Sequence, residues 1–303
     1  MSSADGKKLR IHSILYLNEP DRIAQTIEHL DRAADHLIAQ KCYSEVTLVY
    51  GDCSPRKVFS AERMAALRKD LYALSKFEYR YFESNLGSAR GHNTLLEDLS
   101  DEDVLIINPD IMLAPNAIVE LAKCMAGDER VGVAEAKQLP VEHPKVYDLT
   151  TGATSWAATA CTLIRGSTIR ELNGFDADSF FLYCDDVDFS WRARLAGHKV
   201  VYVPTACAYH DKRLGGGGKW VAGAAERFYS AEAALFLAYK YSRADLTERW
   251  ITDFERSGDD NFLKAAASFR SREAAKTLPK QLDAKHQVAM FVDGSYSAHR
   301  FAL

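Results

Sequence analysis

The sequence predicts an α/β fold with a mostly parallel central sheet, followed by a helical extension at the C-terminal end. Three observations support this prediction: short runs rich in Val, Ile and Tyr, helical periodicity between the early runs, and a change of character near residue 226. Strands that alternate with helices are typical of parallel sheets. Ligands of such sheets bind beyond the carboxyl ends of the strands, so chemistry is expected there.

Seven runs are expected to be strands because they are short, rich in β-branched residues and bounded by Gly, Pro, Asp or Asn. They cover residues 11–17, 46–50, 79–82, 104–107, 131–134, 160–164 and 200–203. Two helices are expected between the first three runs, where apolar side chains recur at three- and four-residue steps. Those side chains belong to Ile23, Ile27, Leu30, Ala34 and Leu37, and then to Met64, Leu67, Leu71 and Leu74.

The part in which strands alternate with helices is expected to form one domain over residues 1–225. Residues 226–303 are expected to form a helical extension packed on it. Residues 226–241 show the pattern of an amphipathic helix, and more helical segments follow. The aromatic residues of this extension fit plain core packing, a dimer interface, a cap over the site or a contact with a membrane surface. The sequence leaves these four alternatives open.

Bulk composition argues against several classes of protein. The 303 residues include 38 basic and 42 acidic ones, a net charge of -4, which argues against a nucleic-acid binder. No stretch approaches the ~18 apolar residues of a membrane span, and residues 1–10 lack an apolar signal core. The six cysteines form no CxxC pair, so free thiols in a reducing compartment are expected instead of a zinc site. These features predict a cytoplasmic protein.

One strand-like run ends in Asn108-Pro109-Asp110, which places a carboxylate at the expected ligand edge of the sheet. Hard divalent cations take oxygen ligands of this kind and share them with substrate phosphates. His210, at the end of another strand-like run, is a second candidate ligand. The alternatives are a plain Asn-Pro-Asp turn and a structural histidine.

Three carboxylates, those of Asp185, Asp186 and Asp188, follow an aromatic run and open a helical pattern. Acidic residues are favoured in a first helical turn, which explains one or two of them. A carboxylate beside apolar rings has a raised pKa and is suited to act as a general base. Asp188 and Arg192 stand four residues apart and fit a helix-surface ion pair.

Two loops carry candidate contacts to an anion. Lys212, Arg213 and Lys219 flank a run of four glycines, and they suit either a clamp on a diphosphate or a solvated basic loop. The run 85–93 follows a predicted strand and offers a helix N-terminus. It is a weak signal by itself because it lacks the glycine spacing of a dinucleotide or P-loop fingerprint.

In this order the segments resemble family 2 glycosyltransferases, which have a GT-A fold, and most closely their rhamnosyltransferase-like members. The resemblance covers residues 9–240. It rests on six segments: Ile14-Leu15-Tyr16-Leu17-Asn18-Glu19-Pro20, Val49-Tyr50-Gly51-Asp52-Cys53-Ser54, Asn85-Leu86-Gly87 through Asn93, Asn108-Pro109-Asp110, Gly174-Phe175-Asp176 through Arg192, and Pro204 with His210. Each segment is a weak signal alone, but six in the family's order are a strong one.

The resemblance implies a role for each matched residue. Asp110 and His210 would hold Mn²⁺ or Mg²⁺, and Asp186 would be the general base. The nucleotide sugar would contact Leu17, Asn18, Glu19, Asp52, Asn85, Arg90, Asn108, Lys212 and Arg213, with Asp52 facing the base and Asn108 near the ribose or diphosphate. The acceptor would contact Asp185 and Tyr183. Trp156 lies in a run of small residues, and two alternatives stay open for it: an exposed indole that stacks on an acceptor sugar, or a side chain in the core.

The sequence departs from the family pattern in four places. Gly51 and Asp52 stand where the family has Asp followed by Asn, which shifts the acid by one position. Asn108 replaces the first acid of the DxD motif and leaves fewer charged ligands. Asp185 replaces a common Glu. Its side chain is shorter, which bears on whether Asp185 or Asp186 acts as the base and which one orients the acceptor. Asn173 stands where a Gly is usual.

The implied reaction is an inverting, metal-dependent transfer of a sugar from a dTDP- or UDP-linked donor, with dTDP-rhamnose the first choice. The acceptor would be a hydroxyl of a glycan or a lipid-linked molecule in surface polysaccharide synthesis. The protein would work in the cytoplasm or on the inner face of the membrane, without a nucleic-acid partner, and a homodimer stays open. The alternatives are a non-catalytic GT-A-like binding module and a nucleotidyltransferase, which the lack of glycine in residues 14–22 disfavours.

Overall fold

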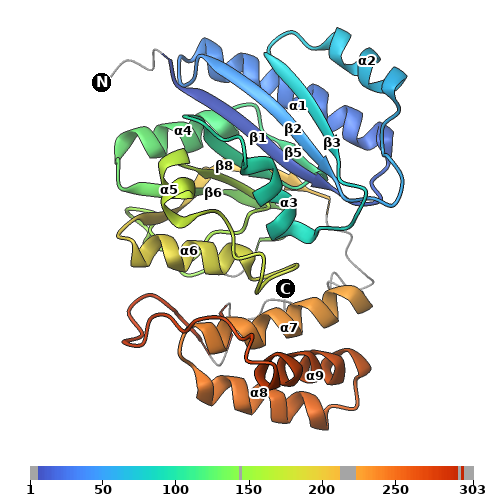
Figure 1. Cartoon of the computed structure of the whole chain (residues 1–303). Coiled ribbons are helices and arrows are strands. Elements are labelled where there is room, and N and C mark those ends of the chain that lie inside the picture. Colours follow the sequence, from blue (N-terminus) through green and yellow to red (C-terminus); the bar gives the residue numbers. More distant parts are fainter. Residues whose placement is uncertain (1–5, 143–144, 212–222, 293–294, 297–303) are drawn as a thin grey trace.

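The computed structural model describes residues 6–142, 145–211, 223–292 and 295–296, and it shows an α/β domain beside a group of C-terminal helices (Figure 1). Within these residues one sheet of eight strands has the order β3-β2-β1-β4-β7-β6-β8-β5. Its strands are β1 (Lys8–Leu15), β2 (Glu45–Asp52), β3 (Lys76–Tyr81), β4 (Asp103–Ile107), β5 (Ile111–Leu113), β6 (Val131–Leu139), β7 (Cys161–Ile164) and β8 (Lys199–His210).

The sheet is parallel on one side and mixed on the other. β1 lies parallel to β2 and β4, and β2 lies parallel to β3. β7 runs antiparallel between β4 and β6, whereas β6 and β8 are again parallel. The short β5 pairs antiparallel with the end of β8. This arrangement confirms the predicted fold class, and each of the seven predicted strands is present.

Two differences from the predicted strands have local causes. The first strand ends at Leu15 instead of 17, because Leu17 has a positive φ of 56° that ends the extended conformation. β5 was not predicted, since its three residues are too few to show an alternating pattern.

Six helices of the α/β domain cover the two faces of the sheet. On one face lie α1 (Pro20–Ala39), α2 (Ala61–Asp70) and α4 (Ala117–Gly127). On the other lie α3 (Gly87–Leu96), α5 (Gly166–Leu172) and α6 (Asp185–Leu195). β4 shows the resulting alternation, since Leu105 packs on the first face and Val104 and Ile106 on the second.

The helix expected to reach Leu74 stops earlier, at Asp70. Beyond it, the buried carboxylate of Asp31 in α1 accepts hydrogen bonds from the backbone N–H groups of Tyr72, Ala73 and Leu74, at 2.8–3.1 Å. These groups would otherwise donate along a helix, so the carboxylate turns the chain towards β3.

The C-terminal helices are α7 (Ala224–Lys240), α8 (Ala244–Arg256) and α9 (Asp260–Ala274). They share one core cluster with residues of α6, including Trp191 and Val187. The helix predicted over 226–241 is therefore present as α7. The proposed boundary at residue 225 stays a prediction, because residues 212–222 lie outside the described part. No helix in the described ranges is long and apolar enough to cross a membrane.

Candidate active site

The ends of β1, β2 and β4 lie at one edge of the sheet because these neighbouring strands are parallel. The chain leaves β1 through a tight turn, in which the N–H of Tyr16 donates to Oδ1 of Asn18 at 2.8 Å. The N–H of Leu17 donates to Oγ of Ser54, just after β2, also at 2.8 Å. The turn is thus fixed to the next strand end. Glu19 follows at the start of α1 and is exposed.

Asp52, expected to face a nucleotide base, is fully buried. Its Oδ1 accepts from the N–H of Ser54 and its Oδ2 from the N–H of Val58, both at 2.8 Å, and the hydroxyl of Tyr79 donates a short hydrogen bond to Oδ2. The carboxylate therefore shapes the loop after β2. Its contact with a base stays a prediction.

Asp110 and His210, predicted as metal ligands, lie together although they are 100 residues apart. The Nε2 atom of His210 is 3.3 Å from Oδ1 of Asp110. The pairing of Ile111 with His210 between β5 and β8 brings them there. The Asp110 side chain is 41% exposed and that of His210 is 10% exposed, so the pair is open to a ligand on the aspartate side.

A third residue holds the histidine of this pair. Nδ1 of His210 lies 2.9 Å from Oε1 of Gln138, a fully buried residue in β6. An amide oxygen there favours a proton on Nδ1, which leaves the lone pair of Nε2 directed at Asp110. A histidine nitrogen and a carboxylate oxygen suit Mn²⁺ or Mg²⁺, with the remaining positions left for phosphate oxygens and water. Among the described residues, no group of three or more His, Cys, Asp or Glu side chains could hold a metal ion, so Asp110 and His210 stand as a pair.

The candidate base Asp186 and its neighbour Asp185 begin α6. The two residues before them, Tyr183 and Cys184, have φ values of 65° and 56°. Residues other than glycine rarely adopt this left-handed region, and backbone strain of this kind is frequent at functional sites. The turn separates the aromatic run from the start of α6.

The two carboxylates differ in their surroundings. Asp185 is 4% exposed, and its Oδ2 has no hydrogen-bond partner within the described structure. Burial, together with the charge of Asp186, raises the pKa of Asp185 to about 7, although a hydrogen bond from Ser88 acts to lower it. Asp186 is only partly buried, and its Oδ1 accepts from the N–H of Val187 at 2.8 Å. Asp186 is thus the more accessible of the two.

The run 85–93 forms the start of α3 and packs against the loop before α6. Oδ1 of Asn85 accepts from the N–H of Gly87, whose φ is 70°. A Cβ atom on Gly87 would lie 2.4 Å from the carbonyl oxygen of Phe181, so glycine is needed for this contact. Arg90 is exposed and pairs with Asp178 at 2.8 Å. This run has a structural role; its predicted contacts with a nucleotide stay predictions.

Of the two alternatives for Trp156, the structure shows a side chain in the core and not an exposed indole. The side chain is 5% exposed and belongs to the core that contains the C-terminal helices. Nζ of Lys145 lies 4.1 Å from the centre of its ring, and the same ammonium pairs with the buried carboxylate of Glu135. Tyr296 packs on it edge to face at 5.4 Å. The small residues around Trp156 suggested a loop, but they allow close packing instead.

Two solved structures share this architecture. The structure described as GalNAc-T7 with UDP, GalNAc and Mn²⁺ aligns over 94% of this chain and 57% of its own, with a TM-score of 0.63 and 11% identity. The mannosyltransferase PcManGT from Pyrobaculum calidifontis, in complex with GDP-Man and Mn²⁺, aligns over 94% of this chain and 79% of its own, with a TM-score of 0.54 and 16% identity. The chain has a GT-A glycosyltransferase fold.

The sequence relatives of this GT-A chain include two named as rhamnosyltransferases. It is 27% identical over 146 residues to rhamnosyltransferase WbbL of Escherichia coli (strain K12), which covers 37% of this chain and 55% of the relative. It is 40% identical over 57 residues to the N-acetylglucosaminyl-diphospho-decaprenol L-rhamnosyltransferase of Mycobacterium tuberculosis, covering 19% of this chain and 18% of the relative. The chain thus spans about half the length of the first and under a fifth of the second. No protein-family model matches the chain.

The contacts predicted for the remaining candidate residues stay predictions. Asn108 is half-buried, and its N–H donates to the carbonyl of Ala160 at 2.9 Å. Tyr183 is half-buried against the core of the C-terminal helices. Lys212 and Arg213 lie outside the described residues. Sequence reasoning missed Gln138, because a glutamine inside a strand gives no signal of its contact with His210.

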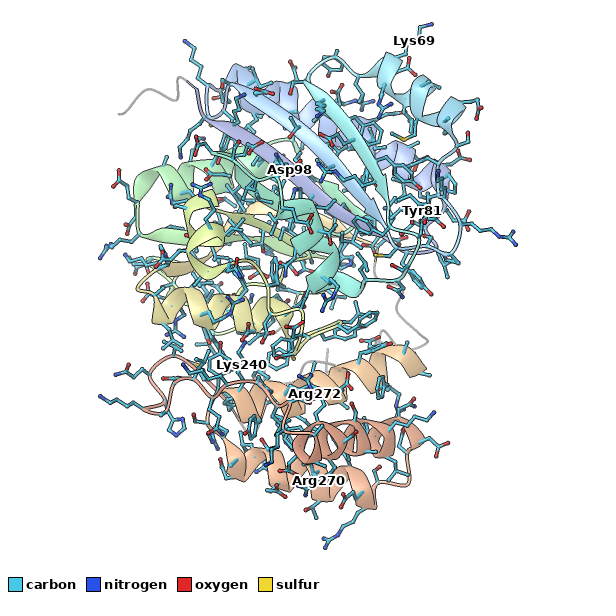
Figure 2. All side chains as sticks on the ribbon, viewed as in Figure 1. Lys69, Tyr81, Asp98, Lys240, Arg270 and Arg272 are labelled. Carbon is cyan, nitrogen blue, oxygen red and sulfur yellow. The ribbon has the colours of Figure 1, made fainter. Side chains whose placement is uncertain are left out.

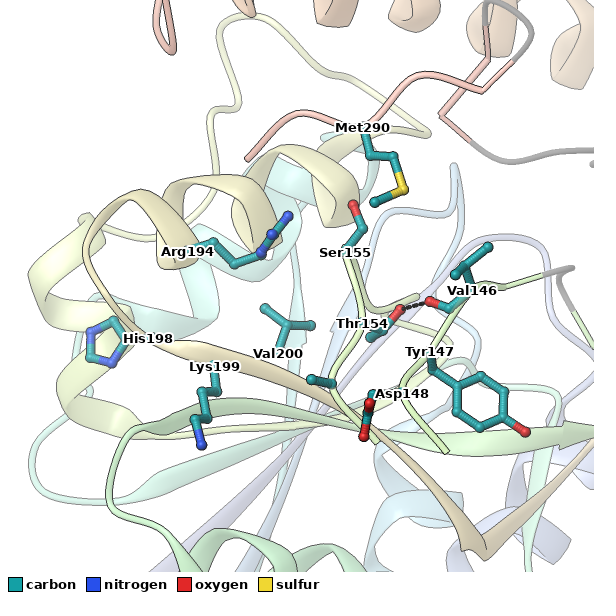
Figure 3. Close-up of a pocket in the computed structure, with 11 residues that line it drawn as sticks. Val146, Tyr147, Asp148, Thr154, Ser155, Arg194, His198, Lys199, Val200 and Met290 are labelled. Carbon is teal, nitrogen blue, oxygen red and sulfur yellow. Dashed lines mark hydrogen bonds between the residues drawn. The ribbon is translucent and has the colours of Figure 1, made fainter. Parts of the chain in front are cut away.

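A separate cavity of about 430 Å³ lies at the other end of α6 (Figure 3). Arg194, His198 and Lys199 line it together with the loop around Thr154 and with Met290. At 1.5 Å per residue, the nine positions from Asp185 to Arg194 correspond to ~13 Å along the helix. The cavity is therefore distinct from the GT-A site at the strand ends.

Proposed function

We propose that the protein is an inverting, metal-dependent glycosyltransferase. It would move a sugar from a nucleotide diphosphate to a hydroxyl group of a glycan or lipid-linked acceptor, in surface polysaccharide synthesis. The approach of Asp110 to His210 at the ligand edge of a GT-A sheet carries this proposal, because a cation held there suits a diphosphate leaving group. The accessible carboxylate of Asp186 on the adjoining helix supplies the second requirement, a base.

The proposed reaction is a direct displacement at the anomeric carbon. Asp186 takes the proton of the acceptor hydroxyl as that oxygen attacks, and the diphosphate leaves from the opposite face, so the anomeric centre inverts. Bound Mn²⁺ or Mg²⁺ would neutralise the charge that grows on the diphosphate. Asp110 and the Nε2 atom of His210 would hold the cation, with Gln138 fixing the orientation of the imidazole.

Asp185 has a different task in this mechanism. Its pKa of about 7 keeps it partly protonated near neutral pH, which reduces repulsion with the neighbouring charge of Asp186. A protonated carboxyl also donates a hydrogen bond, and its partnerless Oδ2 is suited to orient an acceptor hydroxyl. The base in this mechanism is Asp186.

The relatives' names guide the choice of substrates. Both are named as rhamnosyltransferases, which favours a rhamnose donor linked to dTDP, with a UDP-sugar as the second choice. The mycobacterial relative is named for an acceptor that joins N-acetylglucosamine to decaprenol through a diphosphate. We therefore propose a lipid-linked acceptor and a working position at the inner membrane surface. A homodimer stays a prediction.

A thermal-shift panel with UDP, dTDP, GDP and CDP, each with and without Mn²⁺, tests the donor site. A nucleotide at 100 times its dissociation constant should stabilise the fold by about 2.7 kcal/mol. We expect a metal-dependent shift with dTDP or UDP, followed by release of that nucleotide from the matching sugar donor when an acceptor is present. Binding without release would favour a non-catalytic binding module. No shift at millimolar nucleotide would contradict the glycosyltransferase proposal and favour a module that binds a glycan.

A further inference from the structure

Lys240 is the last residue of α7 (Figure 2). It contacts both ends of the segment that carries the candidate catalytic carboxylates. Its Nζ lies 2.6 Å from Oδ2 of Asp176 and 2.6 Å from Oδ1 of Asp188. Asp185 and Asp186 lie between these two aspartates in the sequence. One ammonium group of a C-terminal helix therefore bridges the start and the end of this segment.

The bridge is buried, so each of its charged groups is stabilised by the opposite charge beside it. The side chain of Lys240 is 6% exposed and that of Asp188 is fully buried. Burial alone would raise the pKa of Asp176, but the charge and hydrogen bond of Lys240, together with hydrogen bonds from Ser179, outweigh burial and lower that pKa below its ordinary value. Removing one member of a buried set of this kind leaves a charge without its partner.

Other donors fix Asp188 to its neighbours. Nε of Arg192 donates to its carboxylate at 2.8 Å, and the hydroxyl of Tyr241 donates at 3.1 Å. The remaining nitrogens of Arg192 donate to the carbonyl oxygens of Leu172 and Gly174, after α5. The end of α5, the start of α6 and the end of α7 thus meet in one network of hydrogen bonds and ion pairs.

We propose that Lys240 is a positioning residue, which closes the segment 176–188 and thereby fixes the directions of Asp185 and Asp186. The proposal rests on the proposed function in one respect, the role of Asp186 as the base. It gives the C-terminal helices a part in catalysis, because the residue that closes the segment belongs to α7.

The backbone of the segment explains why a closing contact is needed. Tyr183 and Cys184 are both in the left-handed region, a conformation that persists only where the surrounding structure enforces it. Before this turn, Lys240 holds Asp176 and lies 5.5 Å from the ring centre of Phe180. After it, Lys240 holds the first turn of α6. A turn fixed on both sides cannot relax by moving either end.

Hydrogen exchange and steady-state kinetics on the Lys240→Met variant of the full chain test the proposal. Amide exchange in residues 177–186 should accelerate by about tenfold or more, while the strands β1, β2 and β4 keep their protection. The kcat of sugar transfer should fall by about tenfold or more with the KM for the donor within about twofold, because the strand-end residues are unchanged. Uniform acceleration across the whole domain would mean a merely structural role and would overturn the proposal.

A second variant covers the case in which Lys240→Met does not fold. Asp176→Asn keeps the ion pair between Lys240 and Asp188 but weakens the tie at the start of the segment, so the same local acceleration is expected. Lys264→Met, at an exposed position of α9, is the matched control and should change neither exchange nor kcat. Wild-type exchange rates in 177–186 for Asp176→Asn would also overturn the proposal.

The exchange measurement separates this inference from the proposed function. If the wild-type protein transfers no sugar but Lys240→Met still loosens residues 177–186 alone, the closing role is supported and the glycosyltransferase proposal fails. If the wild-type protein transfers sugar and Lys240→Met keeps both its kcat and its local protection, the positioning role fails and the proposed function stands.

Discussion

The candidate site has two sides that are built in different ways. The strand-end side, with Leu17, Asp52 and Asp110, is fixed by backbone pairing between neighbouring strands, parallel among β1, β2 and β4 and antiparallel between β5 and β8. The α6 side, with Asp185 and Asp186, is fixed by a strained turn and a buried ion network that reaches into α7. The first side should therefore tolerate the loss of single side chains, whereas the second should lose its geometry when one contact is removed.

The largest effect is expected on the α6 side, from Asp186→Asn. Loss of a general base lowers the transfer rate by about 10² to 10⁴, while the shift of melting temperature by nucleotide and Mn²⁺ should persist because the strand-end side is intact. Transfer rates and thermal shifts on the same preparation check this. Asp253→Asn, at an exposed position of α8, should behave like the wild type. A variant that keeps more than about a tenth of the rate would remove Asp186 from the mechanism.

The next effect concerns stability and pH, through Asp185. Its pKa is raised from 3.8 to about 7 in the folded protein, so the folded state holds a proton that the unfolded chain has lost. This carboxyl therefore destabilises the fold progressively as pH rises from about 4 to about 7. Asp185→Asn removes that cost, and its stability relative to wild type should be higher by about 2–3 kcal/mol at pH 8 than at pH 5. Urea denaturation at the two pH values measures it; equal differences at both would contradict the raised pKa.

On the strand-end side, Asp110→Ala should leave the fold intact and weaken metal-dependent nucleotide binding by about tenfold or more. The reason is that the variant lacks one of the two proposed protein ligands of the cation. A Mn²⁺ titration in the presence of dTDP or UDP measures the effect, with Asp101→Ala as an exposed control. Unchanged dependence on Mn²⁺ would show that Asp110 is not a ligand.

The smallest effect is expected from Gln138→Leu, which leaves both proposed ligands in place. Without the amide oxygen, the proton of His210 is no longer held on Nδ1, and Mn²⁺ affinity should fall by about tenfold. Nitrogen NMR of the imidazole should show a change of tautomer in the metal-free protein. Gln138→Glu keeps an acceptor oxygen and should keep the wild-type tautomer; the same spectrum in all three proteins would refute this role.

The strand-end side was largely predictable from the sequence. Apolar runs that end in small polar residues show where parallel strands stop, and parallel strands stop at a common edge. Asp110 and His210 were each expected at a strand end, the family resemblance paired them as metal ligands, and they lie 3.3 Å apart. The sequence did not predict that Asp52 is enclosed by Ser54, Val58 and Tyr79, because hydrogen bonds within a loop follow no periodic pattern.

On the α6 side, only contacts between residues that are close in the sequence were predictable. The cluster of aspartates at the start of a helix was visible, and Asp188 was expected to pair with Arg192 on a helix surface. The pair exists, but Asp188 is fully buried and shared with Lys240. The partner of Asp176 is 64 residues away in the sequence, and no spacing rule covers such a distance. The sequence left a core position open for Trp156, but it could not show that part of its cover comes from Tyr296, 140 residues later.

Gly51 shows how one aromatic ring restricts the evolutionary paths open to this chain. A Cβ atom at this position would lie 2.6 Å from the ring of Phe82 and 2.9 Å from Ile14. An aspartate at position 51, where the family pattern that this sequence resembles has its acid, is therefore incompatible with the Phe82 ring in its present place. The two positions are expected to be epistatic: an acid at position 51 requires that the Phe82 ring moves or that a smaller residue stands at 82.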